Sequence, residues 1–253
     1  MPLKSNSFYH SMSPFYSVII PFKNEEENIL ALVQELEPVM NTLEKHWELI
    51  CLDDGSTDQT AKILENIHMT QGDLRIISFK KNYGQSSAFD AGFQAARGKI
   101  IITLDGDRQN DPKDIPRLLT LIDHADLVCG IRINRRDTIT KRWTSKIANK
   151  VRNWICQDGV QDTGCSLKVY RKECLDKIKM FHGMHRFLPA LFAIEGFRIS
   201  QIAVNHRERI KGKSKYHFFN RSFNTLADLL AVRWMKKRHL QYTIRSNLLK
   251  EKG

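Results

Sequence analysis

The chain has 253 residues, of which 42% are hydrophobic, so it is long enough to bury one substantial core and form a single domain. Its 40 Lys and Arg residues outnumber its 28 Asp and Glu residues, and the formal net charge of +12 favours an anionic partner: a phospholipid surface, a phosphorylated substrate or nucleic acid. The five cysteines are odd in number and include no CxxC pair, which argues against a disulfide framework and a zinc site and favours a reducing cytosol.

The first half of the chain alternates short apolar runs with amphipathic segments, the pattern of a parallel sheet covered by helices. The ligands of such an open α/β sheet bind beyond the carboxyl ends of its strands. The pattern predicts strands at residues 16–20, 48–52, 74–79, 99–104 and 126–131, with helices at 26–45, 57–70, 85–96 and 112–123. Beyond about residue 132 it predicts a basic helix over 141–156, strands over 166–170 and 199–205, and a helix over 218–238.

Polar motifs follow the first two predicted strands. The first strand runs into PFKNE at residues 21–25, and the second runs into DDGSTD at residues 53–58. A purely local explanation is that Gly55 makes a turn and that Ser56 or Thr57 caps the next helix. The adjacent carboxylates of Asp53 and Asp54 repel each other, and capping does not require both, so we interpret the motif as part of a binding site.

The fourth predicted strand runs into the sequence LDGDRQNDP at residues 104–112. Asp105 and Asp107, followed by Gln109, supply hard oxygen ligands for a divalent cation that carries a nucleoside diphosphate. An EF-hand fits poorly because Asn110 occupies its glycine position and Pro116 its closing glutamate position. A lone DxD is often a solvated turn, but this one follows an apolar strand and two earlier motifs, which indicates a nucleotide site.

The succession SVIIPFKNEEEN, DDGSTD, KNYGQSSAFDAGF and LDGDRQNDP resembles glycosyltransferase family 2. In the second half, DTGCSLKVYR at 162–171, HRFLP at 185–189 and RIKGKSKY at 209–216 are similar to the branch of dolichyl-phosphate mannose synthases and bacterial polyprenyl-phosphate glycosyltransferases. The resemblance covers roughly residues 16–240. It implies the GT-A fold, an α/β fold with a Rossmann-like, mostly parallel sheet flanked by helices, here with a C-terminal amphipathic helix.

The resemblance also implies a function: inverting, metal-dependent transfer of a sugar from GDP-mannose or a UDP-sugar to dolichyl or undecaprenyl phosphate by direct displacement. It divides one domain over residues 1–240 into a nucleotide-sugar half (1–131), an acceptor half (132–216) and a membrane-surface helix (217–240), followed by a tail (241–253). It implies nucleotide-sugar contacts from Pro21, Phe22, Glu25, Asp53, Asp54 and Asp105; Mg²⁺ or Mn²⁺ ligands Asp105, Asp107 and Gln109; acceptor-phosphate contacts from Arg132, Arg142, Ser145, Arg209, Ser214 and Lys215; and catalysis by Asp105, Asp107 and Arg209.

Cys165 departs from this branch, whose members often have an acidic residue at its position. The departure is tolerable because a phosphate monoester has a second pKa of about 6 and is already a dianionic nucleophile at neutral pH, so no general base is needed. We therefore interpret Cys165 as a packed small residue. The histidines, including His185 and His206, lack metal-ligand spacing and are interpreted as structural or phosphate-adjacent.

The segment 218–238 has apolar residues close to helical spacing, among them Leu226, Leu230 and Trp234, with basic residues around them. A helix packed on a core is the common explanation. The aromatic and basic residues favour a helix in the headgroup region of an anionic membrane, and residues 141–156 have a similar character. Since no secretory signal and no apolar run of about 18 residues is present, we expect a peripheral protein on the cytoplasmic face of a membrane.

Two other functions stay open at this point. A family 2 transferase that extends a saccharide acceptor, as in lipopolysaccharide or capsule assembly, would share every first-half motif, and residues 209–215 with the basic helices discriminate against it. A non-catalytic binder of anionic lipid or nucleic acid has no chemical reason to keep the DxD. No motif that reads RNA or DNA is recognisable, so no nucleic-acid partner is expected. The sequence does not specify the sugar, the base, the lipid length or the oligomeric state.

Overall fold

A seven-stranded sheet with the strand order β3-β2-β1-β4-β6-β5-β7 forms the centre of the molecule. The computed structural model describes residues 13–68, 73–133, 152–153, 155–156, 158–208, 218–240 and 242. The strands are β1 (Tyr16–Phe22), β2 (Trp47–Asp53), β3 (Leu74–Ser78), β4 (Ile100–Thr103), β5 (Leu127–Arg132), β6 (Lys168–Arg171) and β7 (Ile199–Val204). The helices are α1 (Ile29–Asn41), α2 (Thr60–His68), α3 (Gln85–Ala95), η2 (Pro112–Asp114), α4 (Ile115–Leu119), α6 (Lys172–Leu175), η3 (Met184–Arg186), α7 (Leu188–Ile194) and α8 (Phe218–Arg238).

The sheet is mostly parallel, as predicted. Strand β1 pairs in parallel with β2 and β4, β2 pairs in parallel with β3, and β5 pairs in parallel with β7. Strand β6 is the exception, because it lies antiparallel between β4 and β5. It therefore joins the two parallel groups into one sheet and brings the residues before Lys168 to the carboxyl end of β4.

Most predicted elements are found, with shifted ends. The helix expected over 26–45 is shorter and spans Ile29–Asn41, because residues 23–28 form the loop after β1. The helix expected over 112–123 is a 3₁₀ turn followed by the single short helix Ile115–Leu119. Most of the helix expected over 141–156 lies outside the described residues. The helix expected over 218–238 is observed as α8.

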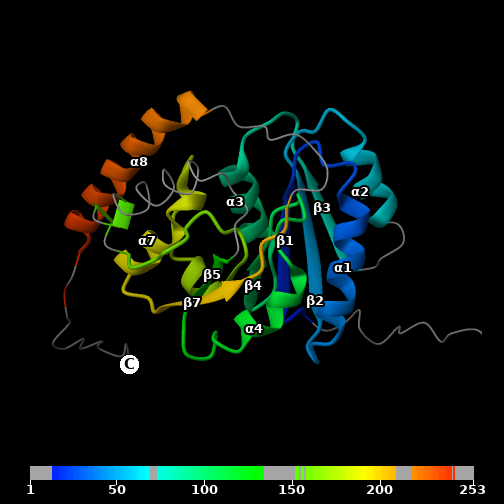
Figure 1. Cartoon of the computed structure of the whole chain (residues 1–253), viewed down its shortest axis with the longest axis horizontal. Helices are drawn as coiled ribbons and strands as arrows, with labels where there is room; N and C mark the ends of the chain where they lie inside the picture. Colours follow the sequence, from blue (N-terminus) through cyan, green and yellow to red (C-terminus); the bar gives the residue numbers. More distant parts are fainter. Residues whose placement is uncertain are drawn as a thin grey trace, which may run out of the picture.

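Helices cover both faces of the sheet, and each face has its own core. Successive residues of a strand point to opposite faces. Val18 and Ile20 of β1 accordingly pack in a core with α1, α2 and α4, whereas Ile19 packs in a second core with α3 and α7. Figure 1 shows α1 and α2 beside one another at the right, and α7 and α8 at the left. Leu229 and Val232 of α8 are buried against α7, so α8 is attached to the domain along one face.

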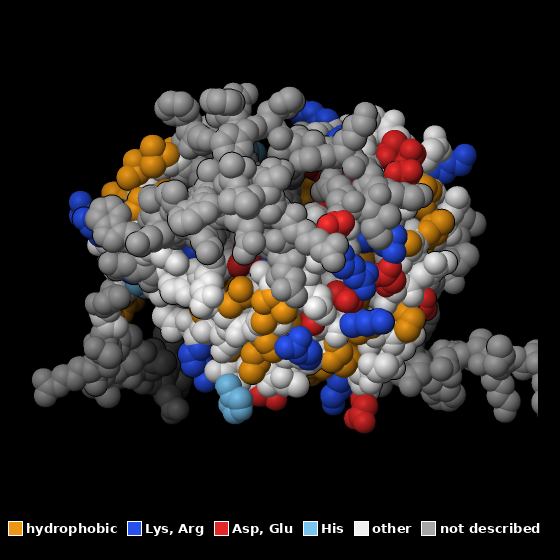
Figure 2. Space-filling model, in the orientation of Figure 1, with side chains coloured by type: hydrophobic (Ala, Val, Ile, Leu, Met, Phe, Trp, Pro, Cys, Tyr) orange, Lys and Arg blue, Asp and Glu red, His pale blue; other side chains and the backbone are white. Residues whose placement is uncertain are grey.

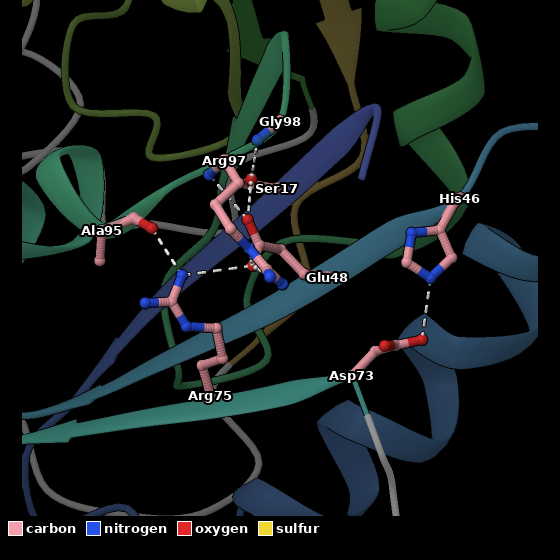
Figure 3. A network of polar contacts seen from close by, with 8 residues as sticks. All are labelled: Ser17, His46, Glu48, Asp73, Arg75, Ala95, Arg97 and Gly98. Atoms are coloured by element: carbon pink, nitrogen blue, oxygen red, sulfur yellow. Dashed lines mark hydrogen bonds and ion pairs between the residues drawn. The ribbon is translucent and has the colours of Figure 1, made fainter. Parts of the chain in front are cut away.

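A buried carboxylate ties strands together at the amino-terminal end of the sheet (Figure 3). Glu48 of β2 is fully buried and accepts hydrogen bonds from Ser17 Oγ at 2.7 Å and from the backbone N–H of Arg97 at 2.8 Å. The guanidinium groups of Arg97 and Arg75 pair with its other oxygen at 2.9 and 3.4 Å. Burial raises the pKa of Glu48, but these bonds outweigh it and hold the pKa below its usual range. This cluster lies at the opposite end of β2 from the DDGSTD motif.

Candidate functional site

The loops that follow β1 and β2 are joined to each other at the carboxyl end of the sheet. Asn24 adopts a left-handed conformation with φ 48°, which asparagine tolerates better than most residues. Its backbone N–H donates to Ser56 Oγ at 2.9 Å, and its side-chain oxygen accepts from the backbone N–H of Thr57 at 2.8 Å. The backbone N–H of Glu25 donates to Thr60 Oγ1 at 2.9 Å. The first two sequence motifs therefore form one structural unit.

The two aspartates of DDGSTD hold backbone groups. Asp53 Oδ1 accepts from the backbone N–H of Ser56 at 2.9 Å and closes the turn. Asp54 is 5% exposed, and its two carboxylate oxygens accept from the backbone N–H groups of Tyr83 and Gly84 at 2.6 and 2.9 Å. Asp54 thereby fixes the loop that leads into α3. Nucleotide contacts were predicted for both residues, and these contacts stay a prediction; what the structure adds is that each side chain also supports a loop.

The remaining predicted nucleotide contacts from β1 have different surroundings. Phe22 is 1% exposed, and a Cβ added at Gly106 would approach its ring to 2.5 Å. The ring of Phe22 thus forms the floor beneath the DGD turn, and only glycine fits above it. Pro21 lies beside Phe22 near the end of β1. Glu25 is 8% exposed and accepts from Asn28 Nδ2 at 2.6 Å.

The DxD residues follow β4 and are held from two sides. Gln85, the first residue of α3, donates from its side-chain amide to Asp105 Oδ1 at 2.8 Å. On the other side, the side-chain oxygen of Asn110 accepts from the backbone N–H of Asp105 at 3.2 Å and from Ser166 Oγ at 2.6 Å. Asp107 is 8% exposed, and its Oδ1 accepts from the backbone N–H of Gln109 at 3.1 Å.

The charges around Asp105 suit a divalent cation. Burial and the neighbouring charge of Asp107 raise the pKa of Asp105 to about 6, against the lowering influence of Lys168 and Arg132. A cation between the two carboxylates would remove that repulsion, so the residues present fit Mg²⁺ or Mn²⁺. Among the described residues no group of three His, Cys, Asp or Glu side chains is arranged for metal binding. The other ligands would therefore come from residues such as Gln109, from the diphosphate or from water.

Residues 162–168 form the wall of the site next to β4. Cys165 is fully buried, donates to the carbonyl oxygen of Leu167 at 3.8 Å, and has its pKa raised to about 11 by burial. A thiol in this state is a packing residue, as the sequence indicated, and not a nucleophile. Lys168, which is 3% exposed, donates to the carbonyl oxygens of Thr163 and Cys165 and places a buried positive charge beside the DxD.

Arg132, predicted to contact the acceptor phosphate, ends β5 and pairs with Asp162. Its Nε and Nη2 donate to the two oxygens of Asp162 at 2.7 and 2.8 Å. This bidentate pair uses two of the five guanidinium donors and fixes the side chain beside Gly164, where a Cβ would approach Nη2 to 2.8 Å. The other predicted acceptor residues, Arg142, Ser145, Arg209, Ser214 and Lys215, lie outside the described residues.

Sequence reasoning missed three side chains that shape this site. Gln85, Asn110 and Ser166 contact Asp105 directly or through one hydrogen bond, although they come from three separate segments. Gln85 and Asn110 stand within the quoted motifs KNYGQ and DGDRQN, which was the available signal. Ser166 stands within the quoted motif DTGCSLKVYR, but its place beside Asn110 follows from the pairing of β6 with β4, which brings residue 166 to the end of β4.

The fold agrees with solved structures that the chain resembles. Glucosyl-3-phosphoglycerate synthase from Mycobacterium tuberculosis, in complex with Mn²⁺, UDP-glucose and phosphoglyceric acid, superimposes with a TM-score of 0.67 at 20% identity, over 87% of this chain and 80% of that one. The complex of the same synthase with Mg²⁺ and UDP gives a TM-score of 0.65. These matches confirm the GT-A type of α/β fold.

Curated relatives are similar over most of the chain. Dodecaprenyl-phosphate galacturonate synthase from Rhizobium johnstonii is 40% identical over 222 residues, which are 85% of this chain and 65% of the relative. Undecaprenyl-phosphate 4-deoxy-4-formamido-L-arabinose transferase from Salmonella choleraesuis is 38% identical over 217 residues, 85% of this chain and 66% of the relative. The chain thus spans just under two thirds of the length of these relatives. The model of the family described as glycosyl transferase family 2 matches residues 17–179, and the chain belongs to that family.

Proposed function

We propose that this protein is an inverting glycosyltransferase that moves a sugar from a nucleoside diphosphate sugar to a polyprenyl phosphate. The observation that carries the proposal is the pair of carboxylates at the carboxyl end of β4: Asp107 is buried, and the half-buried Asp105 is held in place by Gln85 and Asn110. The names of the two relatives support a polyprenyl phosphate as acceptor. In this proposal residues 1–131 bind the nucleotide-sugar donor and residues 132–216 bind the acceptor.

The carboxylates of Asp105 and Asp107, with Gln109, would hold Mg²⁺ or Mn²⁺. A cation bound there stabilises the negative charge that develops on the departing nucleoside diphosphate. The chain itself contributes further positive charge through Lys168, which is buried within Coulombic reach of Asp105. In the reaction, an oxygen of the acceptor phosphate forms the new bond to the anomeric carbon, and the bond from that carbon to the diphosphate breaks with its electron pair leaving on the diphosphate oxygen.

No residue of this chain needs to act as a general base in that displacement. The acceptor phosphate is a dianion at neutral pH, so its attacking oxygen carries no proton that must be removed. Cys165, with a pKa raised to about 11, is consistent with a site that lacks a base at this position. The task of the arginines is to position the phosphate. Arg132 has the planar donors for that task, with its orientation set by Asp162, and the proposal gives Arg209 the same task.

We also propose that α8 lies on the cytoplasmic surface of an anionic membrane. Leu226, Leu230 and Trp234 are spaced by four residues and are 52%, 55% and 62% exposed, so they form an apolar stripe on the face of α8 that points away from the domain. Lys237 and Arg238 are exposed beside it. Figure 2 shows hydrophobic side chains gathered at the upper left, over α8, with basic side chains next to them. No helix in the described part of the chain is long and apolar enough to span a bilayer.

The membrane proposal predicts that Leu230→Glu weakens binding to vesicles of phosphatidylcholine and phosphatidylglycerol, because it puts a negative charge into the stripe. Gln34→Glu, an exposed position on α1, is the matched control. Sedimentation with vesicles measures the effect. Equal binding by the wild type and Leu230→Glu would remove α8 from the membrane contact.

The decisive test of the function is transfer to a short-chain polyprenyl phosphate by the wild type, Arg209→Ala and Arg209→Lys, with nucleotide-sugar affinity measured in parallel. Loss of a charge-assisted contact that strengthens in the transition state costs about 2–4 kcal/mol, or roughly thirty- to a thousandfold in rate. Lysine should substitute poorly because it lacks the planar donors. Equal transfer by all three proteins would contradict the phosphate role of Arg209. Transfer to a saccharide but not to polyprenyl phosphate would replace the proposed acceptor.

A further inference from the structure

Glu35 on α1 lies outside every motif of the sequence, yet its carboxylate joins two arginines that belong to different parts of the site. One oxygen accepts from Arg108, in the metal loop between Asp105 and Asp111, and the other accepts from Arg207, in the segment after β7. The three side chains are 29%, 18% and 29% exposed, so the cluster is partly shielded from water. Arg207 also pairs with Asp111 Oδ1 at 2.7 Å.

The first arm of this cluster supports the metal loop. Arg108 has φ 62°, in the left-handed region, which is uncommon for a residue with a long side chain. It stands between Asp107 and Gln109, so its backbone conformation sets the direction in which both neighbouring side chains leave the loop. A strained conformation of this kind persists when surrounding contacts over-determine it. The ion pair with Glu35 is such a contact, and it comes from a separate element.

The second arm connects the loop to the acceptor half of the chain. The backbone N–H of Arg207 donates to the carbonyl oxygen of Gln109 at 2.9 Å, and His206 forms a β-bridge with Asn110. The segment 206–207 therefore lies along the metal loop as a short added strand. In the sequence it runs directly into Arg209, the residue proposed to bind the acceptor phosphate.

We propose that Glu35 is a positioning residue. It holds the metal loop (residues 105–111) and the segment 206–207 at a fixed spacing, through Arg108 on one side and Arg207 on the other. The proposal rests on the proposed function, since it names the donor and acceptor ends of that reaction. Burial raises the pKa of Glu35, but hydrogen bonds and charges from the two arginines hold it below its usual range, so the carboxylate is ionised at neutral pH.

The test compares Glu35→Gln with Glu44→Gln, which removes an exposed carboxylate in the loop just after α1. Binding of UDP and of GDP with Mn²⁺ is measured without acceptor, and KM for polyprenyl phosphate and kcat are measured with a nucleotide sugar that the wild type uses. Glu35→Gln should raise both the Kd of the Mn²⁺-nucleotide and the acceptor KM by about five- to thirtyfold, the size of a lost pair interaction. Glu44→Gln should match the wild type.

Single variants of the two arginines separate the arms. Arg108→Gln should raise mainly the Kd of the Mn²⁺-nucleotide, and Arg207→Gln mainly the acceptor KM. The double variant Glu35→Gln with Arg207→Gln should raise the acceptor KM by less than the product of the two single effects, because both changes remove the shared contact between Glu35 and Arg207. Strict additivity of the two effects would overturn the link through Arg207.

The outcomes distinguish failure of this inference from failure of the proposed function. If the wild type binds neither nucleotide in the presence of Mn²⁺, the proposed function fails and the role of Glu35 fails with it. If the wild type binds and transfers, but Glu35→Gln lowers only the melting temperature and leaves Kd and KM unchanged, Glu35 is merely structural and this inference alone is overturned. If Glu35→Gln raises the Kd of the Mn²⁺-nucleotide but leaves the acceptor KM unchanged, the proposal that Glu35 fixes the spacing is also overturned.

Discussion

Replacing Asp54 by asparagine tests whether DDGSTD supports a loop or contacts the nucleotide. In the structure, both carboxylate oxygens of Asp54 accept from backbone N–H groups, those of Tyr83 and Gly84, at 2.6 and 2.9 Å. Asparagine has only one acceptor oxygen, so its NH₂ group would face a backbone N–H that has no other acceptor in this position. The residue is 5% exposed, which leaves little access for water to compensate.

The expected cost follows from these contacts. Leaving a buried donor unsatisfied costs about 1–3 kcal/mol. Because the lost bond is to a charged acceptor, Asp54→Asn should lower the free energy of unfolding by about 2–3 kcal/mol. For a chain of this size that lowers the melting temperature by roughly 4–12 °C. Nucleotide affinity should fall as well, because Gly84 is followed by Gln85, whose amide donates to Asp105 Oδ1 at 2.8 Å.

The assay is urea unfolding together with binding of UDP and GDP in the presence of Mn²⁺, with Asp123→Asn as an exposed control. Lower stability combined with weaker binding is the expected result for Asp54→Asn. Weaker binding at wild-type stability would show that the carboxylate contacts the nucleotide directly. Unchanged stability and unchanged binding would refute the loop-clamping role altogether.

Three other substitutions test the DxD motif, the buried thiol of Cys165 and the buried carboxylate of Glu48. Asp107→Ala should abolish metal-dependent transfer and weaken Mn²⁺-nucleotide binding; turnover equal to wild type with Mn²⁺ and Mg²⁺ would remove the DxD from the mechanism. Cys165→Ser should keep most of the activity, and a thousandfold loss in a folded protein would show that the thiol acts in the reaction. Glu48→Gln should cost about 2–4 kcal/mol of unfolding free energy at neutral pH, because it leaves Arg97 beside an uncharged amide. Because the pKa of Glu48 is lowered in the folded protein, the carboxylate stabilises the wild type at neutral pH and stops doing so as the pH falls through the folded pKa. The difference in unfolding free energy between the wild type and Glu48→Gln, measured by urea unfolding, should therefore become smaller in acid. A difference that does not change with pH would contradict this role of Glu48.

The sequence was sufficient to predict the sheet, and the position of the candidate site follows from the order of its strands. Apolar runs such as residues 16–20 and 48–52 identify buried strands, and polar motifs directly after three of them must meet at one edge when the strands are parallel. The place of Asp105 and Asp107 beyond the end of β4 was predictable for that reason. The ends of the helices were less predictable, because residues 26–28 and 112–114 were predicted as helical and form a loop and a 3₁₀ turn in the structure.

What the sequence could not give is the direction of each side chain. Asp53, Asp54 and Phe22 have the residue types of a binding motif, yet the aspartates accept from backbone N–H groups and the ring lies beneath Gly106. A strand end needs polar groups both to satisfy the turn that follows it and to hold a ligand, and the two needs select the same residue types. Only the partner of each oxygen distinguishes them.

The same reasoning explains why Glu35 escaped the sequence analysis although it is central to the arrangement of the loops. It is a charged residue within a helix, beside the buried Leu36, and a charged residue on an amphipathic helix is ordinarily interpreted as part of the solvent-facing side. Its significance depends on Arg108 and Arg207, which are 73 and 172 residues away in the chain. A motif records residues that are close in sequence, whereas the support of a site at the edge of a parallel sheet comes from elements that the crossovers bring together. In this protein the carboxylates predicted to bind a cation therefore lie within a sequence motif, whereas Glu35, which contacts the loop that carries them, does not.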